Sequence, residues 1–225
     1  VGAGTSGPQR AIEAVLNEAG MKKEDMAYTL ATGYGRTSLM DGIADKQMSE
    51  LSCHAKGATF LFPNVHTVID IGGQDVKVLH IDNGAMTNFQ MNDKCAAGTG
   101  RFIEMMMRTL DAPLDSIDTF VQGKKPASIS SMCTVFAESE IVSLLAEGED
   151  AGNIALGMIH AICKRTSFFA QKMNLEGKVF FTGGLSKYEI FRKTLEEYLQ
   201  LEVHTHQMAQ YAGAIGAAVI ASETL

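Results

Sequence analysis

The stretch "HTVIDIGGQDVKVLHID" at residues 66–82 decides the fold. Apolar, β-branched residues stand on both sides of a Gly-Gly pair, a pattern that predicts a strand, a tight turn and a second strand. Between residues 76 and 81 the side chains alternate between two faces, as they do in a strand. Glycines at such a turn let the backbone approach a phosphate closely and direct N–H groups toward it. The pattern indicates a sheet with either an anion-binding turn or a plain tight turn.

A second strand and Gly-Gly turn follows later, in "FTGGLS" at residues 181–186. Ser186 and Glu189 have the spacing of a capping box, which predicts a helix whose positive end faces an anion. The glycine-rich "AAGTGR" at residues 96–101 lies between the two turns. A single Gly-Gly pair is equally well explained as a tight turn, but the three segments together favour a nucleotide site. The chain has no Walker lysine and no G-x-G-x-x-G, so the P-loop and Rossmann folds do not fit.

Helical and strand periodicities alternate along the rest of the 225 residues, which predicts an α/β fold. The net charge of −7 argues against a general nucleic-acid binder. No run of eighteen apolar residues predicts a membrane span, and no secretory signal is visible. Four cysteines without a C-x-x-C pair do not make a disulfide scaffold or a zinc ribbon, so we expect a cytoplasmic protein.

The four cysteines fall into two classes. Cys53 and Cys163 lie within predicted helices, where a free cysteine usually packs as a small apolar side chain. Cys95 and Cys133 each follow polar residues and precede a predicted helix, whose dipole stabilises a thiolate or a negatively charged cluster. Two thiolates cannot complete a Cys₄ iron–sulfur site, but a two-fold dimer supplies two more. A redox thiol without metal is the alternative.

Five motifs, in this order, carry a family resemblance: "ATGYGR", "DIGGQD", "NDKCAAGTGRF", "CTVFAESE" and "TGGLS". Together they resemble the activator ATPases of 2-hydroxyacyl-CoA dehydratases, which form one family with the ATPase subunits of benzoyl-CoA reductase. That family belongs to the actin/Hsp70/sugar-kinase superfamily. The resemblance runs from residue 1 to residue 225.

The resemblance implies an actin-like (ribonuclease H-like) fold with two lobes. Residues 1–64 would form the remainder of the first lobe and residues 65–225 the second, with a closing helix at about 209–225 packing back toward the first lobe. The superfamily normally opens with a β-hairpin that carries a first phosphate loop of the type D-x-G-S-T. This chain starts at "VGAGTSGP", apparently past that hairpin, and we expect it to hydrolyse ATP poorly without it.

The resemblance also implies the site. Cys95 and Cys133 match the ligands of one [4Fe–4S] cluster that is shared by a homodimer. Asp75 and Gln74 are the candidate catalytic residues, and Asp70 and Asp75 flank a turn that can hold Mg²⁺ through water. The candidate residues for binding ATP or ADP are Gly72, Gly73, Gly98, Thr99, Gly100, Gly183, Gly184 and Gln210.

The implied activity is ATP-dependent electron transfer at low potential from ferredoxin or flavodoxin to a 2-hydroxyacyl-CoA dehydratase, with no nucleic-acid or membrane partner. A benzoyl-CoA reductase partner stays open. Two alternatives remain: a sugar or acid kinase of the same superfamily, and a non-catalytic nucleotide-binding sensor. A kinase predicts no iron, and a sensor predicts binding without turnover.

Overall fold

The stretch at residues 66–82 forms the centre of a five-stranded sheet in the computed structural model, which describes residues 6–92, 98–130, 134–173, 175 and 177–225. The strands lie in the order β5-β4-β3-β6-β7, and their bounds are β3 Thr67–Ile71, β4 Val76–Asp82, β5 Ala85–Asn92, β6 Val179–Thr182 and β7 Val203–His204. β3, β4 and β5 pair antiparallel, whereas β6 and β7 continue the sheet parallel to β3. This is the α/β architecture that the alternating periodicities predict.

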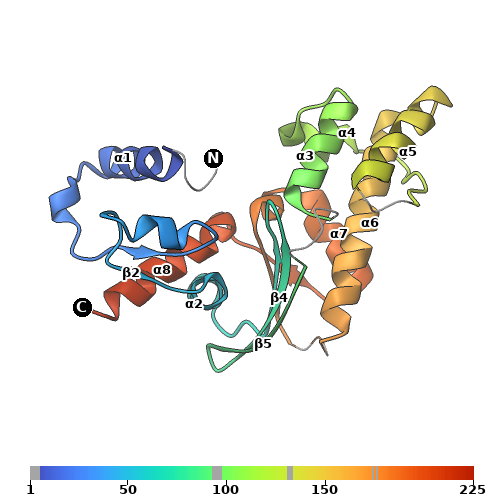
Figure 1. The fold of residues 1–225 in the computed structure, drawn as a ribbon. Helices are drawn as coiled ribbons and strands as arrows, with labels where there is room; N and C mark the ends of the chain where they lie inside the picture. The colour runs from blue at the N-terminus through green and yellow to red at the C-terminus, as the bar shows by residue number, and fades with distance from the viewer. Residues whose placement is uncertain (1–5, 93–97, 131–133, 174, 176) are drawn as a thin grey trace. The chain divides into compact units, whose positions relative to one another are not determined.

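The chain divides into two compact units. Unit 1 comprises Val1–Phe60 and Tyr211–Leu225, and unit 2 comprises Leu61–Gln210. Figure 1 shows that the C-terminal helix runs beside elements from the beginning of the chain within unit 1.

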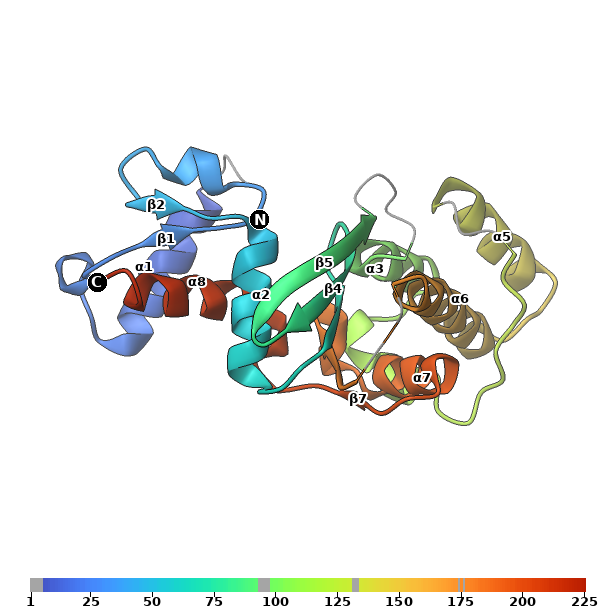
Figure 2. The ribbon, with the colours of Figure 1, turned by 90° about the horizontal axis from the view of Figure 1, so that it is seen from below.

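In unit 2, helices lie on one side of the β4–β5 hairpin in both ribbon views (Figures 1 and 2). Their bounds are α3 Gly100–Thr109, α4 Ile117–Phe120, α5 Thr134–Ala146, α6 Ala151–Gln171 and α7 Glu189–Leu199, with 3₁₀ turns at Leu114–Ser116 and Gly184–Lys187. Large side chains fill the layer between sheet and helices, among them Phe102, Phe181 and Phe191, each at most 1% exposed. Burying each such side chain stabilises the folded state by roughly 1.5–3 kcal/mol.

Polar side chains fix where two of these helices begin. Asp150 caps α6, because its Oδ1 accepts hydrogen bonds from the N–H groups of Gly152 at 2.8 Å and Asn153 at 3.1 Å. Thr99 caps α3 by accepting from the N–H of Phe102 at 3.5 Å. The Thr99 cap therefore fixes the residue at which α3 begins.

Unit 1 is built from α1 Gly7–Ala19, the short strands β1 Leu30–Ala31 and β2 Lys46–Gln47, α2 Glu50–Leu61 and α8 Ala212–Ser222, with 3₁₀ turns at Lys23–Asp25 and Arg36–Leu39. The 3₁₀ turn Ala209–Tyr211 spans the boundary, with Ala209 and Gln210 in unit 2. α2 and α8 approach so closely that a Cβ on Gly216 would lie 1.7 Å from the Cys53 carbonyl oxygen. A Cβ on Gly57 would lie 1.8 Å from the carbonyl oxygen of Ala212. A Cβ on Gly213 would have one atom within 4 Å, the Nδ1 of His54 at 3.8 Å. Of the glycines Gly213 and Gly216 in α8, only Gly216 makes the close contact.

The structure at Ser186 differs from the sequence expectation, and strand β2 and the β4–β5 turn are further local features. Residues 46–47 form strand β2, and the helix that follows begins at Glu50. The Ser186 hydroxyl donates to the Gly183 carbonyl at 2.7 Å and caps no helix. The β4–β5 hairpin turns at Asn83 and Gly84, both with positive φ. Among the described residues, no helix has both the length and the apolar character needed to cross a membrane.

Candidate functional site

The two Gly-Gly turns lie side by side because their strands are neighbours. β3 and β6 are parallel, and Asp70 pairs in register with Thr182, the last residue of β6. The two turns therefore leave the sheet at the same edge, beyond the carboxyl ends of both strands. In open α/β sheets this is where ligands bind.

The third glycine segment is joined to the first turn through the beginning of α3. The N–H of Gly100 donates to the Gly72 carbonyl at 2.8 Å, and the N–H of Arg101 donates to the Gly73 carbonyl at 3.1 Å. A Cβ on Gly100 would lie 3.2 Å from the same Gly72 oxygen. These amides hold the turn in place, so α3 supports the turn rather than leaving its first N–H groups free for an anion.

A buried lysine that the sequence interpretation did not nominate lies beneath this turn. The Lys77 Nζ is 2.5 Å from Asp75 Oδ1 and 3.3 Å from Asp70 Oδ2. All three residues are at most 3% exposed. The Thr182 hydroxyl donates to Asp70 Oδ1 at 3.1 Å and so connects this ion triad to the second strand. A lysine on a strand is usually solvated, and nothing in the local pattern shows that both faces of β4 are covered.

The two glycines of the second turn have different roles. Gly183 has φ +88°, and a Cβ there would lie 2.2 Å from the Ile71 carbonyl oxygen. The second turn packs so closely against β3 that only glycine fits at this position. A Cβ on Gly184 would meet nothing within 4 Å, and this residue is exposed.

A cavity of about 300 Å³ opens between the turns. It is lined by Gly72, Gly73, Gln74, Gly100, Arg101, Glu104, Leu114, Gly184, Leu185, Lys187, Tyr188 and Gln210. Six of these are nominated by the sequence: the three residues of the first turn, Gly100, Gly184 and Gln210. The structure thus brings together residues from four separate stretches of the chain.

The other nominated residues lie beside the cavity rather than on its wall. Asp75 is buried against Lys77, and Gly183 is packed against β3. Thr99 is fully buried as the α3 cap. Gly98 lines a different, small cavity together with Asn92 and Arg165.

An ion pair joins the two 3₁₀ turns, and its cationic member, Lys187, lines the cavity. Asp115 Oδ1 accepts from the Lys187 ammonium at 2.7 Å and from the Tyr188 hydroxyl at 2.8 Å. The hydrogen bond from Lys187, followed by that from Tyr188, lowers the pKa of the Asp115 carboxyl, and the same contact raises the pKa of Lys187. Lys187 and Arg101 bring positive charge to the cavity, against one carboxylate on its wall, that of Glu104.

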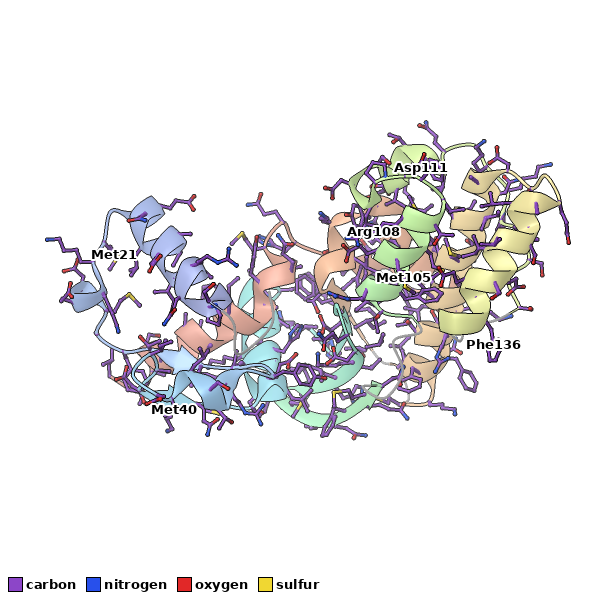
Figure 3. All side chains as sticks on the ribbon, turned by 45° about the horizontal axis from the view of Figure 1, so that its top comes forward. Met21, Met40, Met105, Arg108, Asp111 and Phe136 are labelled. Carbon is purple, nitrogen blue, oxygen red and sulfur yellow. The ribbon has the colours of Figure 1, made fainter. Side chains whose placement is uncertain are left out.

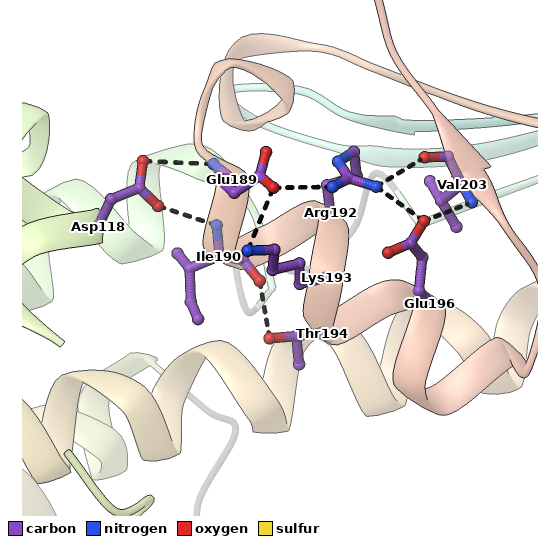
Figure 4. Close-up of polar contacts among 8 residues, drawn as sticks. All are labelled: Asp118, Glu189, Ile190, Arg192, Lys193, Thr194, Glu196 and Val203. Atoms are coloured by element: carbon purple, nitrogen blue, oxygen red, sulfur yellow. Dashed lines mark hydrogen bonds and ion pairs between the residues drawn. The ribbon is translucent and has the colours of Figure 1, made fainter. Parts of the chain in front are cut away.

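The helix after the second turn is capped from another part of the chain (Figure 4). Asp118 Oδ1 accepts from the N–H of Ile190 at 2.8 Å, and its Oδ2 accepts from the N–H of Glu189 at 3.3 Å. The positive end of α7 therefore faces this carboxylate, and the expectation that Ser186 and Glu189 form a capping box is wrong. Asp118 lies about seventy residues earlier in the chain, beyond the reach of a local pattern.

The cysteines divide as the sequence predicts for two of them. Cys53 and Cys163 are free and fully buried, and burial raises the pKa of each thiol. Cys95 and Cys133 lie outside the described residues. Within the part of the chain that the structure describes, no three His, Cys, Asp or Glu side chains are grouped as a metal site would require.

Comparison with known proteins identifies the relatives of this chain. It is 56% identical over 222 residues to the (R)-2-hydroxyglutaryl-CoA dehydratase activating ATPase of Acidaminococcus fermentans, covering 98% of this chain and 85% of the relative. It is 47% identical over 225 residues to the activator of lactoyl-CoA dehydratase of Anaerotignum propionicum, covering 99% and 86%.

Solved structures agree with this relationship. The activator of the 2-hydroxyisocaproyl-CoA dehydratase from Clostridium difficile, with bound ADPNP, superposes with a TM-score of 0.94 at 40% identity, covering 99% of this chain and 83% of that one. MreB 5 of Spiroplasma citri superposes with a TM-score of 0.53 at 13% identity, covering 100% and 78%, and shares the actin-like fold alone. The sequence profile of the BadF/BadG/BcrA/BcrD ATPase family matches residues 4–221. The chain is therefore a member of the BadF/BadG/BcrA/BcrD ATPase family with an actin-like fold.

Proposed function

We propose that this protein activates a 2-hydroxyacyl-CoA dehydratase by ATP-driven electron transfer. The observation that carries the proposal is the cavity between the two Gly-Gly turns, whose wall combines backbone, two cations and apolar side chains. Relatives that match nearly the whole chain are named as dehydratase activators, and one of them was solved with an ATP analogue. A phosphate chain needs close backbone approach and positive charge, and a nucleoside needs apolar surface.

The cavity suggests an orientation for the nucleotide. The phosphates lie against Gly72, Gly73 and Gln74, with Gln74 positioned to orient a water for hydrolysis. The nucleoside lies toward Gly184, Leu185 and Gln210. Asp70 and Asp75, the carboxylates nominated to hold Mg²⁺ through water, are instead buried against Lys77, so we assign Mg²⁺ no protein ligand.

In the proposed electron-transfer half of the activity, Cys95 and Cys133 each supply a ligand to one [4Fe–4S] cluster on the two-fold axis of a homodimer. The described helix that follows Cys133, α5, supports this placement, since a helix N-terminus favours negative charge. Phe136, labelled in Figure 3, lies on α5 and is 66% exposed. Val142 on the same helix is 53% exposed. Large apolar side chains exposed on the helix after a cluster ligand suit an interface with a second copy.

Ferredoxin or flavodoxin is the proposed donor, and the dehydratase is the proposed acceptor. The two-lobed division, residues 1–64 and 65–225 with a closing helix at about 209–225, belongs to the same proposal. Nucleotide binding would change the relation of the lobes and, through it, the angle between the cluster-bearing helices. Coupling to ATP is required because injecting an electron into a thioester-activated substrate is strongly uphill.

The first test is the iron content and native mass of protein purified without oxygen. We expect about two irons per chain in a dimer, as one shared four-iron cluster requires. Cys95→Ala should abolish the iron, and Cys53→Ala is the matched control because Cys53 lies buried in α2. An iron-free monomer, or equal iron loss in both variants, would contradict the cluster.

The second test is ATP-dependent activation of a purified 2-hydroxyacyl-CoA dehydratase with a reduced donor. Activation should require ATP and should be lost with Cys95→Ala. ATP hydrolysis without activation of any such dehydratase would refute the proposed partner while leaving the nucleotide site intact.

A further inference from the structure

A second hollow of unit 2 lies on the surface of α6 and takes no part in the glycine-turn cavity. It is a groove of about 530 Å³, here called the α6 groove, lined by Ile129, Ala161, Lys164, Arg165, Ser167, Phe168, Gln171 and Tyr198. The Phe168 side chain is 56% exposed. An exposed aromatic side chain beside an open groove is typical of a protein-binding surface and not of the hydrophobic core.

The charge of the α6 groove is opposite to that of the protein. The chain carries a net charge of −7, yet α6 contains Lys164 and Arg165 and no acidic residue along its whole length. Lys172 follows the helix, and its ammonium lies 4.4 Å from the centre of the Phe168 ring. The groove is therefore a local basic patch on an acidic protein.

The two cations in the α6 groove are unpaired. Lys164 and Arg165 are exposed and take part in no side-chain hydrogen bond or ion pair with the residues that the structure describes. In the same unit Lys124, Lys187 and Arg192 are each paired with a carboxylate. Unpaired cations grouped beside an apolar surface are available to the carboxylates of a partner.

A buried serine also lines the groove. Ser167 lines the groove and is 2% exposed, and its Oγ has no hydrogen-bond partner among the described residues. Helical serines commonly satisfy such a hydroxyl by bonding back to an earlier carbonyl, but this one does not.

We propose that the α6 groove docks an acidic protein partner, and that this partner is the electron donor. The identification of this partner as the electron donor rests on the proposed function, in which the donor must bind and dissociate each time it delivers an electron. Small, charge-steered interfaces suit such short encounters. Arg165 also lines a small cavity with Asn92 and Gly98, the described residues that precede and follow Cys95 most closely in the sequence.

The test is direct binding of an acidic ferredoxin to the dimeric protein at low ionic strength, read by biolayer interferometry so that no electron transfer is needed. Lys164→Glu should weaken binding about fivefold to tenfold and reduce its salt dependence. Lys125→Glu is the matched control, since it is an exposed lysine with the same charge change. Its backbone contacts Asn153, about 16 Å along α6 from residue 164.

Each outcome decides the proposal. Weakening by Lys164→Glu, rescue by Lys164→Arg and a less than twofold effect of Lys125→Glu would support it. Equal weakening by Lys164→Glu and Lys125→Glu would show an effect of the overall charge and overturn the proposal. Unchanged ferredoxin binding with weakened dehydratase binding would assign the groove to the other partner and overturn the donor. Iron content and ATP-dependent activation, measured on the unmodified protein, report separately whether the proposed function fails.

Discussion

The glycine-turn cavity and the α6 groove are two hollows of one unit with opposite construction. Around the cavity the charged groups are connected: Lys77 to two carboxylates below the turn, and Lys187 to Asp115 on the wall. In the groove Lys164 and Arg165 have no partner among the described residues. This difference separates the charges that stabilise the fold from the charges that can contact another molecule. Removing the buried charge of Lys77 should therefore lower stability, and substitutions in the groove should not.

The largest effect is expected from Lys77→Met. The change leaves Asp70 and Asp75 buried at 3% exposure without their counter-charge, so the free energy of unfolding should fall by roughly 3–5 kcal/mol. Lys124→Met is the matched control. It breaks an exposed ion pair with Asp150, and the loss should be at most about 1 kcal/mol. Urea unfolding followed by circular dichroism measures both, and equal losses would contradict the supporting role of Lys77.

The two glycines of the second turn should separate folding from binding. Gly183→Ala places a methyl group 2.2 Å from the Ile71 oxygen at a positive φ, so stability should fall by about 2–4 kcal/mol. Gly184→Ala meets no atom and should change stability by less than about 1 kcal/mol. Its methyl group extends from the cavity wall, so ADPNP affinity should fall on the order of tenfold. Unchanged affinity in Gly184→Ala, measured by calorimetry, would remove this residue from the nucleotide site.

The smallest effect is expected in the groove. Phe168→Ala removes a side chain that is 56% exposed and should change the free energy of unfolding by no more than about 0.5 kcal/mol. Phe102→Ala, on α3 at 1% exposure, should cost about 3–5 kcal/mol. A large loss at Phe168 would show that the groove is part of the core and weaken its assignment as a docking surface.

Local pattern was sufficient for the elements that position the site. The strand, turn and strand at residues 66–82 and the helix at Thr134–Ala146 follow from periodicity and glycine placement. The Asn83-Gly84 turn is a hairpin signal that sequence interpretation overlooked, although two central residues of positive φ are typical of that dipeptide. These features depend on residues that are neighbours in the chain.

The features that escaped prediction depend on distant residues. The pairing of Lys77 is understood only once β4 is known to be covered on both faces. The capping of α7 by Asp118 joins residues about seventy positions apart. Gly57 is required because α8 crosses α2 at that point. In each case tertiary contact decides the role of a residue whose local sequence is uninformative.

The most direct test of the account is hydrogen exchange by mass spectrometry with and without Mg²⁺ and ADPNP. Protection should appear in peptides covering residues 70–76 and 182–188, because the nucleotide is proposed to lie against both turns. The peptide covering residues 161–171, which forms the α6 groove, should exchange at an unchanged rate. Unchanged exchange at both turns, or nucleotide-dependent protection confined to the groove, would contradict the assignment of the cavity as the ATP site.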